Sequence, residues 1–137
     1  MQPNNFIPVK CNEYSFYRAW IEFLVPYHKL TSREQDVAAR ILATYFKLKE
    51  YIDDPEVLRD VLWSLNSRKD MREAEKMTQA HFQMVLGKLK KAGFLVDGNI
   101  APMYIPNKGK EPRFVLAVVF DWSSAKKPIT RPISDAQ

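Results

Sequence analysis

The hydrophobic pattern of this chain changes its period once, at Gly93. Before that glycine, apolar residues recur at the three- and four-residue spacing of amphipathic helices. After it, the expected strands 94–96 and 99–105 flank Asp97-Gly98, a dipeptide typical of a tight hairpin turn, and a further strand is expected from Arg113 to Trp122. A chain that places its helices first and its strands last predicts an α+β fold, mostly helical, with a C-terminal β-hairpin.

Capping signals divide the part before Gly93 into five expected helices. Thr31 and Glu34 have the spacing of a capping box, in which each side chain bonds a backbone amide of the first turn. Asp53-Asp54-Pro55 is expected to end that helix and cap the next, and Asn66-Ser67 to break the chain before a short polar helix. Thr78 is expected to cap the last one. The expected ranges are 13–25, 31–52, 55–65, 68–76 and 78–92.

The first expected helix is rich in aromatic residues and is flanked by a proline-containing segment on its N-terminal side. We expect Pro26 to stop it. Its inner face is expected to carry Phe16, Trp20, Phe23 and Leu24. The expected organisation is an extended arm over residues 1–12, one domain over 13–122, and an extended polar tail over 123–137.

The residue types that support catalysis or metal binding are scarce. Cys11 is the only cysteine, and His28 and His81 lie far apart without a cysteine or histidine partner at ligand spacing. The four glycines form neither a phosphate-binding loop nor a dinucleotide motif. We therefore expect no enzyme, no catalytic residue, no metal, no cofactor and no small-molecule substrate. No apolar run is long enough for a membrane span, and no secretory signal is visible.

The net charge of +5 and the isoelectric point of about 9.3 permit contact with a polyanion. The distribution of the charge is more informative than its sum. Residues 76–96 contain no Asp or Glu, but they include Lys76, Lys88, Lys90 and Lys91. The acidic residues cluster in 50–60 and 70–75 instead. One face of the protein is therefore expected to be positive.

The run from Met71 to Leu95 contains, in order, a short helix, a turn with Met77 pointing inward, the Thr78 cap and a second helix. The inward residues of this second helix are expected to be Phe82, Val85, Leu86 and Leu89. Gly93-Phe94-Leu95 then leads into the hairpin. This order resembles the winged helix-turn-helix superfamily, and with the flanking elements the resemblance extends from Leu30 to Trp122. It implies a winged-helix fold with an additional aromatic N-terminal helix. The superfamily serves DNA binding, protein docking and scaffolding alike, so the resemblance leaves the function open.

If the chain reads duplex DNA, residues 78–92 would enter the major groove and the basic residues would meet phosphates. The candidate DNA contacts are Gln79, His81, Gln83, Lys88, Lys90, Lys91, Lys108, Lys110 and Arg113. Several residues depart from such a reader. Met84 and Gly87 stand on its exposed face, and Arg72 and Glu75 occupy positions that are usually small or apolar, so the helix before the turn is expected to pack loosely.

A more particular resemblance begins at Leu65-Asn66-Ser67, runs through 88–93 and takes in 97–100 and Ile105-Pro106. It is similar to small winged-helix-type proteins of tailed phages of Bacteroidales, the crAss-like group. The resemblance implies a phage context, in which the chain is a virion component or a DNA-binding factor. The expected location is the virion or the cytoplasm of the bacterial host.

The favoured interpretation is a non-catalytic assembly protein, such as a ring, connector or tail component, that binds neighbouring protein subunits, either copies of itself or other virion proteins. Exposed aromatic anchors dominate the energetics of such interfaces. The candidate partner contacts are Phe6, Ile7, Tyr17, Trp20, Phe23, Pro128, Ile129, Pro132 and Ile133. The alternative is a winged-helix regulator that binds double-stranded DNA. Exposure of Gln79, Gln83 and Lys88 on a positive patch would favour DNA, whereas burial under neighbouring chains would favour assembly.

Overall fold

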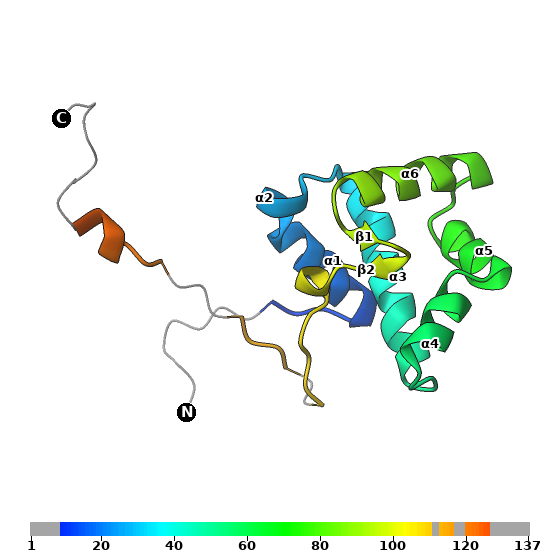
Figure 1. Cartoon of the computed structure of the whole chain (residues 1–137), viewed down its shortest axis with the longest axis horizontal. Coiled ribbons are helices and arrows are strands. Elements are labelled where there is room, and N and C mark those ends of the chain that lie inside the picture. Colours follow the sequence, from blue (N-terminus) through cyan, green and yellow to red (C-terminus); the bar gives the residue numbers. More distant parts are fainter. Residues whose placement is uncertain (1–8, 111–112, 117–119, 127–137) are drawn as a thin grey trace. The chain divides into compact units, whose positions relative to one another are not determined.

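The computed structural model describes residues 9–110, 113–116 and 120–126 (Figure 1). These residues are mostly helical and contain one two-stranded antiparallel sheet, which confirms the α+β class. The chain divides into two compact units, Met1–Pro106 and Asn107–Gln137. The domain expected from the sequence over 13–122 includes residues of both units. Each unit is described by itself.

The N-terminal unit begins with α1 (Glu13–Phe23) and the short α2 (Val25–His28). The inner face of α1 is partly as expected. Leu24 is buried and Phe16 and Trp20 pack against the core, but Phe23 is half-exposed. The fully buried residues of α1 are Tyr17 and Ile21, which were not expected there. Pro26 does not simply stop α1, because it occupies the first turn of α2, where a missing backbone amide costs no helical hydrogen bond.

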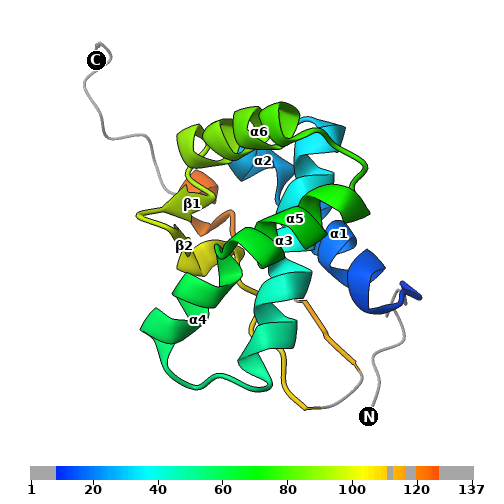
Figure 2. The same cartoon turned by 90° about the vertical axis from the view of Figure 1, so that its right-hand side faces the viewer.

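The longest helix, α3 (Ser32–Lys49), passes through the centre of the N-terminal unit (Figure 2). The expected capping box is confirmed, with Thr31 and Glu34 each accepting a hydrogen bond from the backbone amide of the other. Contacts reach α3 from α1, α4, α5 and α6. Because Ala38 and Ala39 are small and fully buried, neighbouring helices can approach α3 closely.

Two short helices follow, α4 (Pro55–Leu62) and α5 (Leu65–Ala74). The cap at Asp54 is confirmed. The expected break at Asn66-Ser67 is wrong, because the hydroxyl of Ser64 accepts a hydrogen bond from the amide of Ser67 and starts α5 before that dipeptide. Leu65 consequently lies on the outside, 79% exposed, and does not extend the apolar stripe of α4.

The last helix, α6 (Gln79–Lys91), begins and ends as expected. Thr78 accepts a hydrogen bond from the amide of His81. Gly93 has a φ of +84°, and the amides of Gly93 and Phe94 donate to the carbonyls of Lys90 and Leu89. This pair of bonds is the Schellman arrangement, which needs the left-handed conformation that glycine adopts at little cost.

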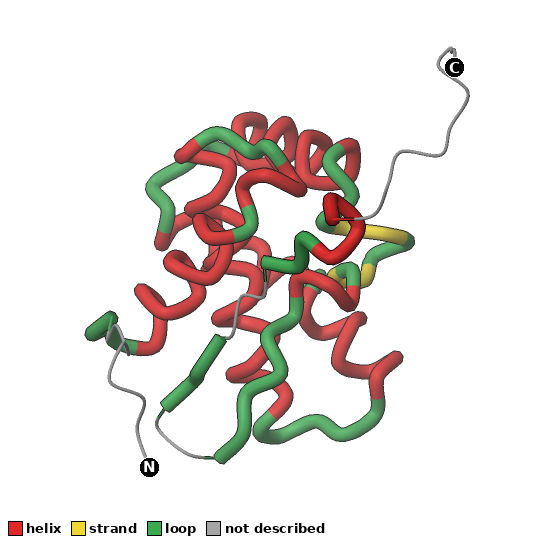
Figure 3. The backbone as a smooth tube through the Cα atoms, turned by 90° about the vertical axis from the view of Figure 1, so that its left-hand side faces the viewer, coloured by secondary structure: helices red, strands yellow, loops and turns green. Residues whose placement is uncertain are grey.

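The strands β1 (Leu95–Val96) and β2 (Asn99–Ile100) pair antiparallel and are joined by Asp97-Gly98 (Figure 3). Both turn residues have positive φ, as a two-residue hairpin turn of this kind requires. The expected second strand stops at Ile100 and not at Ile105. Pro102 lacks the amide that a longer ladder would need, and it begins a short 3-10 helix, η1 (Pro102–Tyr104).

The C-terminal unit does not contain the strand expected over Arg113–Trp122 within its described residues 113–116 and 120–122. The sheet among the described residues consists of β1 and β2 alone. The tail after Trp122 was expected to be extended from its start. Instead, the 3-10 helix η2 (Ser123–Lys126) begins there, with Asp121 accepting a hydrogen bond from the amide of Ser123.

Candidate nucleic-acid interface

The inner side of α6 fixes which of its residues face outward. Its anchors are buried in the core of the N-terminal unit, as the sequence predicted, and they are Phe82, Val85, Leu86 and Leu89. Met77, just before the helix, is buried as well. With these anchors in the core, α6 lies along the edge of the unit, with the hairpin below its C-terminal end (Figure 2).

The outward side of α6 is exposed over the whole length of the helix. Its exposed residues are Gln79, Ala80, His81, Gln83, Met84, Gly87, Lys88, Lys90 and Lys91. Residues spaced by four and three along a helix share one side, so Ala80, Met84, Gly87 and Lys91 form its outermost line. The six α6 residues predicted to contact DNA all lie on this exposed surface.

The charges on this surface are of one sign. Lys88, Lys90 and Lys91 lie in the last turns of α6, and none of them forms an ion pair with any residue that the structure describes. Lys76, in the turn before α6, is exposed and has a φ of +55°. Lysines without carboxylate partners keep their full attraction for an external anion, which is screened only by salt.

The turn that precedes α6 is held by a buried carboxylate. Glu75 is 7% exposed and accepts hydrogen bonds from Arg40 Nε at 2.8 Å and from Arg33 Nη1 at 3.0 Å. Arg33 also donates to the backbone carbonyl of Glu75. Glu75, expected to loosen the packing of the helix before the turn, is thus paired with two guanidinium groups of α3 that compensate its burial.

These contacts continue into α1 as one network of charged groups. Asp36 accepts from Arg18 Nε at 2.8 Å and from Arg33 Nη1 at 3.2 Å. Arg40 also lies over the ring of Tyr14, 4.2 Å from its centroid. Burial, and then the negative charges of Glu75 and Asp36, raise the pKa of Tyr14. The network links α1, α3 and the end of α5, and thus fixes the point from which α6 starts.

The remaining predicted DNA contacts lie in the other unit of the chain, which is described by itself. Lys108, Lys110 and Arg113 belong to the C-terminal unit. The hairpin that follows α6 has the exposed Asp97 in its turn, and it carries no lysine or arginine between Phe94 and Ile100. It is anchored by Trp63, whose indole Nε1 donates to the carbonyl of Gly98 at 2.7 Å. The candidate interface is therefore α6 with the turn before it.

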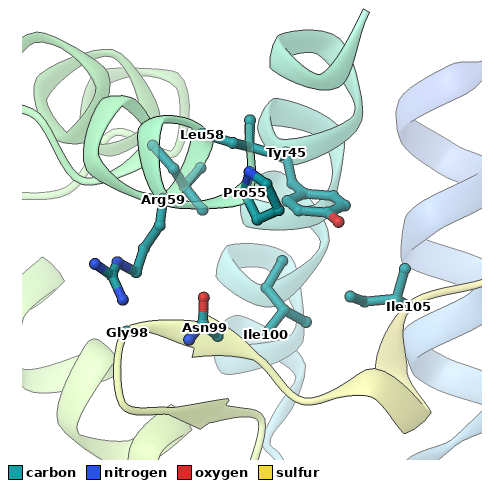
Figure 4. Close-up of a pocket in the computed structure, with 9 residues that line it drawn as sticks. Tyr45, Pro55, Leu58, Arg59, Gly98, Asn99, Ile100 and Ile105 are labelled. Carbon is teal, nitrogen blue, oxygen red and sulfur yellow. The ribbon is translucent and has the colours of Figure 1, made fainter. Parts of the chain in front are cut away.

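A small pocket lies between α3, α4 and the hairpin (Figure 4). Its lining includes Tyr45, Leu58, Arg59, Asn99 and Ile100, and its volume is about 100 Å³. Pockets that enclose drug-sized molecules measure about 300–1,000 Å³. Gly98 faces the stem of Arg59 here, where an added Cβ would lie 3.5 Å from Arg59 Cδ. The pocket is better explained as a packing gap where the hairpin meets α4.

The residues predicted to contact protein partners differ in their exposure. Tyr17 is fully buried and stacks on Phe46 with ring centroids 5.4 Å apart, so its assignment as a partner contact is wrong. Trp20 is half-buried and donates its indole hydrogen to the carbonyl of Tyr104. Phe23 is exposed, as is Tyr27, which the sequence had not singled out. The other contacts, Phe6, Ile7, Pro128, Ile129, Pro132 and Ile133, lie outside the described residues.

No group of three or more metal-binding side chains occurs in the described ranges. Cys11 is exposed, and His28 is buried with both ring nitrogens bonded, to the carbonyl of Ile21 and the amide of Leu30. None of the helices in the described part of the chain has the length and apolar character to cross a membrane. Comparison with protein-family models, curated proteins and solved structures found no match for this chain.

Proposed function

We propose that this protein binds duplex DNA with the exposed side of α6. The observation that carries the proposal is the contrast within one small unit. Arginines on α1 and α3 are paired with carboxylates, but the three lysines of α6 have no such partner among the described residues. Unpaired cations on the exposed side of a helix can bind the phosphate backbone, which supplies most of the sequence-independent affinity for DNA.

The order of the elements supports a winged-helix interpretation. In it, α3 is the supporting helix, α5 and α6 form the helix-turn-helix, and β1 with β2 is a short wing. The second helix of such a pair enters the major groove, which is wide enough to admit an α-helix. The ion pairs from Glu75 to α3 would hold the turn rigid, so that α6 presents its exposed side without first having to become ordered.

Different parts of α6 would then have different roles. Gln79, His81 and Gln83 lie in its first half, where a recognition helix approaches base edges. Lys88, Lys90 and Lys91 lie in its second half and would contact phosphates on the flanking backbone. The proposal needs no contribution from the hairpin, whose exposed Asp97 would be repelled by phosphate.

The test measures binding of the full chain to a labelled mixed-sequence duplex of about 20 base pairs, two turns of B-DNA, by fluorescence anisotropy. Salt is varied from about 50 to 200 mM. The variant K88Q/K90Q/K91Q is compared with K10Q/K47Q/K49Q, which removes the same charge from exposed lysines elsewhere. We expect the α6 variant to lose on the order of tenfold or more in affinity, and its salt slope to fall by about 2.7, or 0.9 for each lost phosphate contact.

The control variant should keep most of its affinity and its salt slope. If both variants lose affinity equally, only net charge matters and α6 is not the interface. If the wild-type chain does not bind duplex DNA at the lowest salt concentration, the proposal fails.

A second candidate function, docking to other protein subunits, is favoured by the exposed aromatic side chains at the end of α1 and in α2. Phe23 is 50% exposed and Tyr27 is 67% exposed. Large exposed aromatic side chains are typical anchors of protein interfaces. We expect light scattering of the full chain to show an assembly that F23S/Y27S reduces to monomers. A wild-type chain that is monomeric at all concentrations would rule out self-assembly through Phe23 and Tyr27.

A further inference from the structure

We propose that α6 reads A·T base pairs through Gln83 and the apolar residues Ala80 and Met84, an inference that rests on the proposed DNA binding. These three residues lie together in the first half of the helix, and all are exposed. Met84 is 58% exposed and is not among the described residues that form the hydrophobic core or pack against it. The chemistry of the proposed site therefore combines one amide with a small apolar patch.

The position of this patch follows from the buried side of α6. Phe82 is nearly completely buried, and Ala80 and Met84 each lie two residues from it. Two residues along an α-helix correspond to about 200° of rotation, so both point directly away from the core. They occupy the line that would reach deepest into a groove. Gln83 lies beside them, with its amide on the flank of the same line.

The major groove presents a different pattern for each base pair. Adenine offers an acceptor at N7 and a donor at N6, which match the two ends of a glutamine amide. Thymine offers a methyl group, which prefers apolar partners. Guanine offers two acceptors and is most often read by arginine or lysine. The first half of α6 has no arginine or lysine, since all its lysines lie from Lys88 onward. Ala80, Gln83 and Met84 therefore fit A·T pairs better than G·C pairs.

Gly87 supports a close approach of DNA on the same line. It lies inside α6, where glycine is among the weakest helix formers. A Cβ added at Gly87 would meet nothing within 4 Å, so packing inside the protein does not require a glycine. A DNA surface that comes close to the helix backbone at this point would leave no room for a side chain, and it would therefore require a glycine. Gly87 lies one turn beyond Gln83 and Met84, where the wall of the groove would pass.

The experiment uses the full chain and four duplexes of equal length: all A·T, all G·C, mixed, and A·T with deoxyuridine in place of thymidine. Uracil lacks only the methyl group, so it isolates the contact assigned to the apolar residues Ala80 and Met84. We expect the wild-type chain to prefer the A·T duplex over the G·C duplex by on the order of tenfold or more, as one bidentate pair provides. We expect the uracil duplex to bind several-fold more weakly than the thymine duplex.

The variants separate the assigned contacts. M84A should reduce the difference between the thymine and uracil duplexes, because the shorter side chain leaves the methyl contact mainly to Ala80. Q83A should lose most of the preference for A·T, and both variants should keep the salt slope of the wild type. G87A should raise the melting temperature of the free protein and weaken DNA binding, because alanine improves the helix but adds a methyl group at the contact. Reduced binding together with a lower melting temperature would instead indicate damage to the fold.

The outcomes distinguish this inference from the proposal on which it rests. If no duplex binds, DNA binding itself fails. If all duplexes bind equally and K88Q/K90Q/K91Q removes that binding, DNA binding stands and A·T reading is wrong. If the preference for A·T survives in both Q83A and M84A, the preference arises from the shape of A·T-rich DNA, and the assignment to these residues is overturned.

Discussion

Two basic regions lie in the N-terminal unit, and they differ in how their charges are matched. On α1 and α3, Arg18, Arg33 and Arg40 are each bonded to a carboxylate at 3.2 Å or less. On α6, three lysines have no carboxylate partner among the described residues. Both regions contribute to the net charge of +5, but the charges of the three arginines are matched by carboxylates, whereas those of the three α6 lysines are not matched within the described residues. Net charge alone therefore indicates little about where a polyanion would bind.

The choice of residue agrees with this difference. Arginine has a planar group with several fixed donors, which suits it to bridging carboxylates in a partly buried network. Arg33 uses two nitrogens in this way, one on the Glu75 carboxylate and one on its backbone carbonyl. Lysine carries a strongly hydrated charge on a flexible stem, which suits it to mobile phosphate contacts at a surface. The first region builds the fold and the second would meet the ligand.

The largest effect on stability is expected in the arginine network. In R33M/R40M the aliphatic stems remain, but the carboxylate of Glu75, 6% exposed in its side chain, loses both cations. We expect the free energy of unfolding to fall by about 3–5 kcal/mol, the usual cost of leaving a buried charge unpaired. Urea denaturation followed by circular dichroism measures it.

A substitution of Glu75, the carboxylate partner of both arginines, makes this prediction more specific. E75Q keeps a hydrogen-bond acceptor, and it leaves behind two arginines whose side chains are 43% and 28% exposed and can be solvated. Its cost should be smaller, about 1–3 kcal/mol. An E75Q variant as unstable as R33M/R40M would show that burial of the carboxylate is not the source of the effect.

The sequence predicted the α6 region correctly because its signals are local. Thr78 as the cap, Gly93 at the C-terminal end and the spacing of the four apolar anchors each act within one or two turns of helix. The same holds for the Asp97-Gly98 hairpin. The six predicted DNA contacts on α6 are exposed because their inward neighbours were identified correctly. Local patterns thus predicted the part of the molecule that carries the candidate site.

The arginine network could not be predicted from the sequence, because it depends on contacts between residues far apart in the chain. Glu75 and Arg33 are separated by 42 positions, and nothing near Glu75 indicates that two cations would cover it. The burial of Tyr17 was missed for a similar reason. Phe16, Tyr17 and Trp20 are all large and apolar, and only packing against α3 decides that Tyr17 is the buried one.

A smaller effect, dependent on pH, is expected from the core beside the network. Burial, and then the charges of Glu13 and Glu50, raise the pKa of Tyr17 to about 12 from its usual value near 10. Between these values the unfolded chain loses the phenolic proton and the folded protein keeps it. The free energy of unfolding should therefore fall as the pH rises, by about 1.4 kcal/mol per unit, and this contribution is fully present below pH 10.

Urea titrations between pH 9 and 12 measure this slope, and Y17F supplies the control because it cannot ionise. The difference in stability between the wild type and Y17F should change with pH over that interval. A difference that stays constant would mean that Tyr17 ionises equally in the folded and unfolded chains.

The smallest effect on stability is expected on the α6 surface. Neutralising Lys88, Lys90 and Lys91 removes their favourable interaction with the C-terminal end of the helix dipole, but it also removes their mutual repulsion. These opposing contributions should leave K88Q/K90Q/K91Q within about 1 kcal/mol of the wild type in urea denaturation. The same variant is expected to lose most of its DNA binding. A large loss of stability would mean that these lysines have carboxylate partners after all, and the contrast between the two basic regions would disappear.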